Sequence, residues 1–181
     1  MKKIVAIGGS NSSTSINKQL AVYTAKRAAS TSETPAEVHV IDLNDYDLPI
    51  YGIDLEKLNG IPQAAKDMWS HIETADGIVI SLAEHNGSYS AAFKSAFDWM
   101  SRHQKDVWAN KPMILMGTSP GGRGAIGVIE AAAQKFPRMG AQIVAQYSLP
   151  SFSQNFTGEA IADADKESEL QAAIEALISA M

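Results

Sequence analysis

The sequence contains no cysteine. Disulfide bonds, thiolate zinc sites and cysteine nucleophiles are therefore excluded, and the absence fits a reducing compartment. No apolar run approaches the roughly 20 residues that a membrane-spanning helix needs. The apolar stretch before Gly8 is also too short for the core of a signal peptide. We expect a cytoplasmic protein with no membrane partner.

Basic residues are outnumbered as well. The chain has 15 lysines and arginines against 20 aspartates and glutamates, which gives a net charge of -5. Nucleic-acid-binding domains usually carry a basic stripe, so no nucleic-acid partner is expected. The sequence shows no internal repeat and no low-complexity linker. Its length fits one domain that spans residues 1–181.

Short apolar, β-branched segments alternate with helical patterns along the chain. Strands are expected at 3–7, 37–41, 77–82, 112–117 and 142–148, helices at about 15–29, 62–73, 89–101, 124–136 and 167–179, and a long loop at 42–61. This alternation predicts right-handed crossovers and a doubly wound α/β fold, in which helices cover both faces of a parallel sheet. Ligands of such folds bind at the C-terminal ends of the strands. The loops after the first, third and fourth strands are therefore the candidate site.

The first of these loops is residues 8–17, Gly-Gly-Ser-Asn-Ser-Ser-Thr-Ser-Ile-Asn. Its hydroxyls and the free N–H groups of the following helix form an anion site that suits a phosphate. Because the loop contains no lysine or arginine before Lys18, the donors are mostly neutral. Neither a dinucleotide-binding glycine pattern nor a Walker sequence is present. The alternative is that these polar residues only form a turn, with Ser15 as the helix N-cap.

The loop after the third strand, residues 83–89, runs directly into a helix. The Asn-Gly pair at 86–87 can direct backbone N–H groups toward the carbonyl oxygens of a planar heterocycle, while Glu84 and His85 offer side chains. The alternatives are an ordinary turn, a solvent-facing His85, and Ser88 as N-cap of the next helix. No second histidine lies at metal-ligand spacing, so no metal site is predicted.

The helix after this loop carries Lys94, Asp98 and Arg102 four residues apart, which predicts a ladder of surface ion pairs. Its small and aromatic residues pack either in the core or against another subunit. After the fourth strand, the glycines of residues 118–124 surround Arg123 and permit close backbone approach to a ligand. The alternative is a flexible loop. Residues 149–156 either line a substrate pocket or pack against the last helix.

These motifs resemble those of the NAD(P)H-dependent FMN reductases of the flavodoxin-like superfamily, which include quinone, azo-dye and chromate reductases. Residues 9–21 are similar to the family's phosphate loop, Gly-Ser-x-Arg-x-x-Ser-x-Asn-x-x-Leu-Ala, with Ser12 in place of the usual arginine. Residues 48–54 are similar to its Leu-Pro-x-Tyr-x-x-Asp segment. Residues 84–102 resemble its isoalloxazine loop and helix, with His85 where tyrosine is usual.

The resemblance implies a three-layer flavodoxin-like sandwich with strand order 2-1-3-4-5 and a homodimeric or homotetrameric assembly. It also implies FMN as cofactor, NAD(P)H as electron donor, and a quinone, flavin or azo compound as small-molecule acceptor. The residues expected at FMN are Ser10, Ser12, Ser15, Ile16, Asn17, Glu84, His85, Asn86, Gly87, Ser88, Ser119, Gly121 and Gly122. His85 and Arg123 are expected to tune the flavin, and no side chain is expected to act as nucleophile or general base.

Three other interpretations remain. The chain could be a non-enzymatic flavodoxin that carries electrons between proteins, although such carriers are more acidic around the flavin. It could bind FMN as a diffusible substrate, because Ser12 removes the usual positive charge. A phosphoacceptor receiver domain would need an acidic cluster after the first strand, where this chain has residues 8–13.

Overall fold

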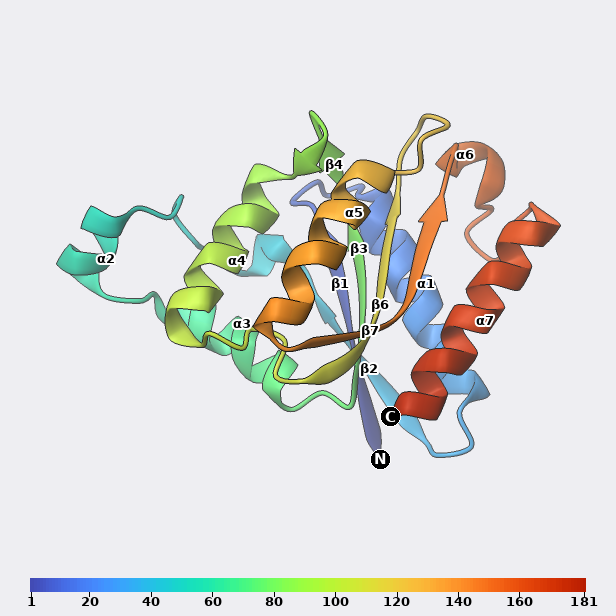
Figure 1. Cartoon of the computed structure of the whole chain (residues 1–181), viewed down its shortest axis with the longest axis horizontal. Helices are drawn as coiled ribbons and strands as arrows, with labels where there is room; N and C mark the ends of the chain where they lie inside the picture. Colours follow the sequence, from blue (N-terminus) through green and yellow to red (C-terminus); the bar gives the residue numbers. More distant parts are fainter.

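The computed structural model describes residues 1–181. Its centre is a five-stranded parallel sheet in the order β2-β1-β3-β6-β7 (Figure 1). The strands are β1 (Lys2–Gly9), β2 (Ala36–Ile41), β3 (Gly77–Leu82), β6 (Lys111–Thr118) and β7 (Ala141–Leu149). Counted as the five long strands of the chain, this is the order 2-1-3-4-5, so the predicted flavodoxin-like α/β fold is confirmed.

Helices cover both faces of the sheet (Figure 1). One face carries α1 (Ile16–Thr31) and α7 (Ala164–Ala180), and the other carries α3 (Gln63–Glu73), α4 (Ala91–His103) and α5 (Ile126–Lys135). Every residue of β3 is buried, with Val79 in the cluster under α1 and Ile80 in the cluster under α3 to α5. A strand covered on both faces needs apolar residues on both, which explains why β3 is apolar except for Ser81.

The aromatic residues of α4 belong to the core of this chain. Phe93 and Phe97 stack with ring centroids 5.9 Å apart, and Phe97 lies 5.4 Å from Phe136. Trp99 is fully buried and its indole N–H donates to the carbonyl of Pro49 at 2.8 Å. Of the two interpretations of this helix, packing within the chain is therefore the one confirmed for its aromatic face.

The prediction of an unbroken loop at 42–61 is wrong. The segment contains a 3-10 turn, η1 (Leu43–Asp45), and the short helix α2 (Ile53–Asn59). Because α2 buries no side chain, it lacks the apolar periodicity that marks a helix in a sequence. Figure 1 shows α2 projecting from one end of the molecule. Three further short elements were also missed: η2 (Phe136–Met139), α6 (Phe152–Asn155), and a hairpin of β4 (Glu84–His85) and β5 (Ser88–Tyr89).

Two long helices, α4 and α7, begin at other residues than the sequence predicted, because side-chain caps set where they start. Ser90, not Ser88, caps α4: its hydroxyl accepts from the N–H of Phe93 at 3.2 Å and donates to the carbonyl of Gly9 at 2.7 Å. This corrects the interpretation of Ser88 as N-cap, since Ser88 lies in β5. Asp163 starts α7 at residue 164 by accepting from the first-turn N–H groups. Side-chain caps fix where a helix begins more sharply than periodicity does.

The predicted ion-pair ladder on α4 forms only in part. Lys94 and Asp98 pair at 2.6 Å, as expected for residues four apart. Arg102 pairs instead with Glu56 of α2 at 3.0 Å, and Glu56 also accepts from the hydroxyl of Tyr51 at 2.9 Å. Arg102 thus has a partner that is distant in sequence, because α2 lies beside the end of α4 in the fold, and this contact could not be predicted from residue spacing.

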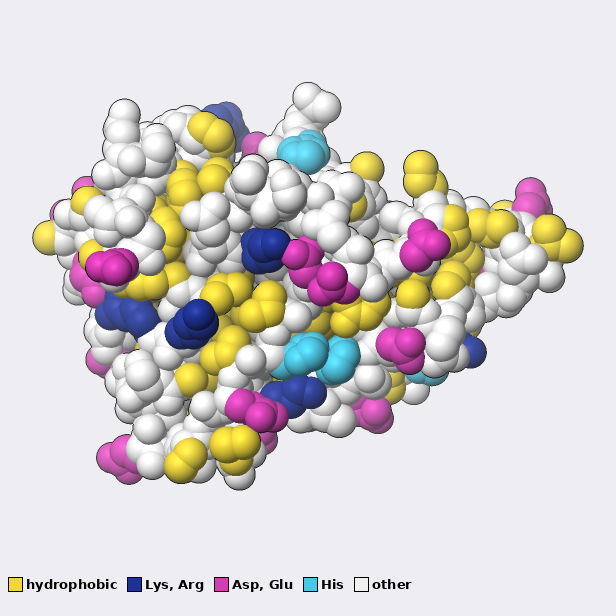
Figure 2. Space-filling model, turned by 180° about the vertical axis from the view of Figure 1, so that it is seen from behind, with side chains coloured by type: hydrophobic (Ala, Val, Ile, Leu, Met, Phe, Trp, Pro, Cys, Tyr) yellow, Lys and Arg dark blue, Asp and Glu magenta, His cyan; other side chains and the backbone are white.

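The face seen in Figure 2 carries hydrophobic side chains between scattered basic, acidic and histidine side chains, without a continuous basic stripe. No helix combines the length and the apolar character that crossing a membrane requires.

Candidate functional site

A cavity of about 340 Å³ lies at the C-terminal ends of the strands. Its walls come from the three loops that the sequence singled out. The lining residues are Ser10, Ser12, Thr14, Ser15, Ile16, Asn17, Ala83, Glu84, His85, Thr118, Ser119 and Pro120. A larger hollow of about 890 Å³ lies elsewhere, between α1, Val40 of β2 and the segment at 156–158. The smaller cavity is the candidate site because parallel sheets bind ligands at this edge.

The N-terminus of α1 points into this cavity. Glycine at position 8 lets the helix begin close to β1, because a Cβ there would lie 2.7 Å from the Cα of Lys18. Ser15 is the N-cap: its hydroxyl accepts from the N–H of Lys18 at 3.1 Å, and its own N–H donates to the carbonyl of Ser12. The capping interpretation of Ser15 is therefore confirmed. The N–H groups of Ile16 and Asn17 have no protein acceptor and line the cavity.

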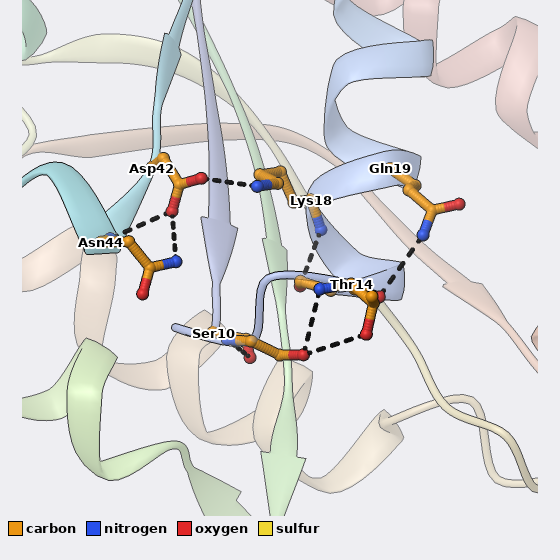
Figure 3. A network of polar contacts seen from close by, with 8 residues as sticks. Ser10, Thr14, Lys18, Gln19, Asp42 and Asn44 are labelled. Atoms are coloured by element: carbon orange, nitrogen blue, oxygen red, sulfur yellow. Dashed lines mark hydrogen bonds and ion pairs between the residues drawn. The ribbon is translucent and has the colours of Figure 1, made fainter.

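The loop before the helix is held by its own hydroxyls (Figure 3). The Ser10 hydroxyl accepts from the N–H of Ser12 at 3.1 Å, and the Ser12 hydroxyl accepts from the N–H of Thr14 at 3.3 Å. Each hydroxyl that accepts in this way still has a hydrogen to donate. The loop thus presents neutral donors in a fixed arrangement.

The lysine that follows the loop, Lys18, is engaged in an ion pair and does not line the cavity. Lys18 pairs with Asp42 at 2.5 Å (Figure 3). Burial raises the pKa of Asp42, but the hydrogen bonds from Lys18 and Asn44 outweigh it and hold that pKa below its usual value. The ion pair therefore persists at neutral pH, and no basic side chain is among the residues that line the cavity except His85.

The Asn17 side chain makes three hydrogen bonds inside the protein. Its carbonyl oxygen accepts from the Ser81 hydroxyl at 2.7 Å and from the Thr118 N–H at 3.0 Å. Its amide nitrogen donates to the Thr118 carbonyl at 3.1 Å. Asn17 thus joins the first turn of α1 to β3 and β6, and its backbone N–H is left for a ligand.

The loop after β3 is a two-residue hairpin. Glu84 pairs with Tyr89 and His85 with Ser88, and the two residues between them have positive φ, 52° at Asn86 and 75° at Gly87. This is the geometry of a type I′ turn, for which Asn-Gly is the strongest sequence signal. That signal could have predicted the hairpin. Its tip is exposed, and no atom lies within 4 Å of a Cβ placed on Gly87.

The glycine loop after β6 has two unobstructed glycines and is hydrogen-bonded to the segment after β7. A Cβ at Gly121 or Gly122 would meet no atom within 4 Å, so both leave room for a ligand. The N–H of Ser151 donates to the Gly121 carbonyl at 2.9 Å, and the N–H of Phe152 donates to the Ser119 carbonyl at 3.1 Å. The segment after β7 therefore supports the loop, while Arg123 is exposed and has no ion pair.

These residues fit a flavin mononucleotide. The free N–H groups of Ile16 and Asn17 and the neighbouring hydroxyls suit a phosphate. The glycines at 87, 121 and 122 do not line the cavity, but they are unobstructed and belong to the two loops that supply its other walls, where a planar ring would lie. Residues 2–154 match the model of the NADPH-dependent FMN reductase family. The chain belongs to this family.

Curated relatives include a 2-hydroxy-1,4-benzoquinone reductase from Burkholderia sp., which is 34% identical over 123 residues. That match covers 67% of this chain and 63% of the relative. A quinone reductase from Escherichia coli (strain K12) is 30% identical over 119 residues, which cover 66% of this chain and 61% of the relative. The matched region thus spans less than two thirds of either relative.

Solved structures extend the similarity to the full chain. FerB, a flavoenzyme NAD(P)H:(acceptor) oxidoreductase from Paracoccus denitrificans, superposes with a TM-score of 0.74 at 25% identity, covering 99% of this chain and 96% of that one. The apo form of the NADH:FMN oxidoreductase EMOB gives the same TM-score at 19% identity, covering 100% of this chain and 90% of that one. The second likeness concerns the fold alone.

Proposed function

We propose that this protein is an NAD(P)H-dependent FMN oxidoreductase that passes electrons to a quinone, a flavin or a similar small acceptor. The observation that carries the proposal is the convergence of the unpaired N–H groups of Ile16 and Asn17 with the two open loops at one sheet edge. Bound FMN would supply the hydride-accepting centre, as cofactors do in such enzymes. Family membership and the quinone reductases among the relatives support the acceptor class.

The chain's own residues bind and orient in this proposal. The hydroxyls of Ser10, Ser12 and Ser15 and the first N–H groups of α1 hold the phosphate. The backbone of the hairpin at 86–88 faces one edge of the ring, where N–H groups stabilise negative charge. Gly121 and Gly122 leave the face of the ring open for a second planar molecule to stack. His85 and Arg123, both exposed, remain the proposed tuning groups, and no side chain transfers a proton.

Equilibrium binding and turnover test this proposal together. Purified protein is expected to quench the fluorescence of added FMN, and anaerobic NADH or NADPH is expected to bleach the bound flavin. A simple benzoquinone should then restore the colour and sustain nicotinamide oxidation without any protein partner. Protein that neither quenches FMN nor oxidises either nicotinamide with FMN present would overturn the proposal. Turnover only with a protein partner would instead identify an electron carrier.

Free basic side chains close to the flavin would argue against an acidic electron carrier. Lys94 and Arg102 are both neutralised by carboxylates, so only Arg123 remains as an unpaired positive charge beside the glycine loop. The turnover assay therefore decides between the two functions. The cytoplasmic location stays a prediction of the sequence.

We also propose that the protein is a homodimer joined through α2 and the segment before it. Ile50 and Leu58 are 84% and 80% exposed, and Ile53 is 49% exposed, all on a projecting element that buries no residue of its own. Apolar side chains gathered on such an element usually mark a protein interface. Light scattering of the purified protein tests the assembly, and a homotetramer would require a second surface.

A further inference from the structure

Helix α5 begins without a cap of its own. Its N-cap residue is Ala125, which has no side-chain acceptor and lies in the left-handed region with φ 61°. Alanine is among the poorest N-caps, because nothing in its side chain can bind the first N–H groups of the helix. The first turn of α5 therefore needs an acceptor from elsewhere in the chain.

Glu84, in the hairpin at 84–89, supplies that acceptor from 44 residues before Val128. Its carboxylate oxygen Oε2 accepts from the N–H of Val128 at 3.0 Å. A negative charge is also favoured at the positive end of the helix dipole. The partner strand is anchored separately, because Tyr89, which pairs with Glu84 across the hairpin, packs its ring near Phe93 at 5.6 Å and Phe136 at 6.3 Å.

Gly127 leaves the space in which the carboxylate lies. A Cβ at Gly127 would be 3.0 Å from Oε2 and 3.3 Å from Oε1 of Glu84, closer than nearly all such contacts. This glycine has no positive φ, so backbone conformation does not require it. Glycine is the least favoured residue after proline inside a helix. The close approach of Glu84 is the physical reason for it here.

We propose that Glu84 is a positioning residue that ties the hairpin at 84–89 to α5, and thereby sets the gap between the hairpin and the glycine loop at 118–124. This gap is the slot for the flavin ring, so the inference rests on the proposed function. Glu84 acts through the backbone it holds, and its carboxylate also places a fixed negative charge at the wall of the cavity.

A double-mutant cycle tests the tie. Glu84→Ala removes the acceptor, and Gly127→Ala crowds it, because the carboxylate must move by a few tenths of an ångström to make room for the new Cβ. Glu84→Ala is expected to raise the dissociation constant of FMN about 10-fold, the usual worth of a hydrogen bond to a charged group, and Gly127→Ala is expected to raise it by less. The double variant should bind no more weakly than Glu84→Ala. Additive losses, or no loss in Glu84→Ala, would overturn the proposal.

Two further measurements separate positioning from a general structural effect. Riboflavin, which lacks the phosphate, should lose affinity for Glu84→Ala by the same factor as FMN, since the hairpin faces the ring. A loss confined to FMN contradicts the assignment.

Glu84→Gln keeps an acceptor for Val128, so it should largely restore binding. It should also shift the midpoint potential of bound FMN upward, because a negative charge beside the reduced flavin is gone. An unchanged potential in Glu84→Gln would contradict a charge at the slot.

Hydrogen exchange of the flavin-free protein tests the tie independently of the function. Amides at 86–89 should exchange faster in Glu84→Ala, while those of β3 and β6 stay protected. The control is Glu130→Ala, which removes an exposed carboxylate from the same helix and should change nothing. Unchanged exchange in Glu84→Ala overturns the tie. Failure of the wild-type protein to bind any flavin would overturn the proposed function and leave the exchange result valid.

Discussion

Asn17 and Ser12 show how differently two residues of one loop contribute. Asn17 is buried and satisfies three hydrogen bonds between α1, β3 and β6. Ser12 is exposed and contacts only Thr14 with its side chain. We therefore expect Asn17 to affect the stability of the fold and Ser12 to affect the affinity for an anion.

Asn17→Ala should destabilise the fold. It removes three hydrogen bonds and leaves the Ser81 hydroxyl and the Thr118 N–H buried without a partner, which together cost about 2–4 kcal/mol. Urea denaturation measures this loss. Gln19→Ala is the matched control, because Gln19 is an exposed polar residue on the same helix and its replacement should change stability by less than about 0.5 kcal/mol. Equal stability of Asn17→Ala and wild type would contradict the role given to Asn17.

Ser12→Arg should strengthen FMN binding. A guanidinium on the cavity wall adds a charge-assisted hydrogen bond to the phosphate, which predicts about a 10-fold lower dissociation constant at low salt. Riboflavin affinity should not change. Ser13→Arg provides the control, since Ser13 is exposed in the same loop but does not line the cavity. An FMN affinity that stays the same in Ser12→Arg would mean that this position does not contact the phosphate.

At the scale of elements, the strands and the long helices were predictable and the short elements were not. A helix such as α3 buries Met68 and Ile72 one turn apart, and this spacing is visible in the sequence. α2 buries nothing, and the hairpin at 84–89 is too short for any periodicity. The hairpin was nevertheless encoded in its Asn-Gly turn, whereas the capping of α5 by Glu84 was not, since it joins residues distant in sequence.

The edge strand β2 and helix α3 meet through two histidines. His39 and His71 stack with ring centroids 3.8 Å apart. Burial lowers the pKa of both histidines, and the charge of Lys3 lowers both further. The pKa of His71 is also lowered by the neighbouring His39. Glu37 raises the pKa of His39 and Asp67 raises that of His71, but these effects are smaller. Each histidine thus binds a proton more weakly in the folded state than in the unfolded state.

The sign of the resulting pH dependence follows from this difference. The contact contributes its full stability above the unfolded pKa of about 6.5 and loses it as pH falls through the lower folded pKa. We expect the free energy of unfolding to fall between pH 7 and pH 5, and His71→Gln to reduce this slope. Urea denaturation at several pH values measures it. His103→Gln is the control, and an equal slope in wild type and His71→Gln would contradict the prediction.

At the scale of the whole molecule, the proposed homodimer depends on exposed apolar side chains such as Leu58. Leu58→Glu should convert the proposed dimer to a monomer, because it places a charge where an apolar contact is expected. Light scattering after size-exclusion chromatography measures the change. Asn59→Glu adds the same charge one residue along without removing an apolar side chain and should leave the dimer intact. A wild-type protein that is already monomeric would refute the proposed interface.

The sequence by itself determined the parallel sheet and the three loops that gather at its C-terminal edge, and the family resemblance implied the strand order. Strand patterns and connection lengths restrict an alternating α/β chain to few topologies, and parallel strands then gather their loops at one edge. Only the tertiary structure decided what the side chains in those loops do. Asn17 joins the sheet, Lys18 pairs with Asp42, and Glu84 caps α5. The loop at 8–17 presents neutral donors, as its composition predicts, and the fold gives a reason: Lys18 is paired with Asp42, which follows β2.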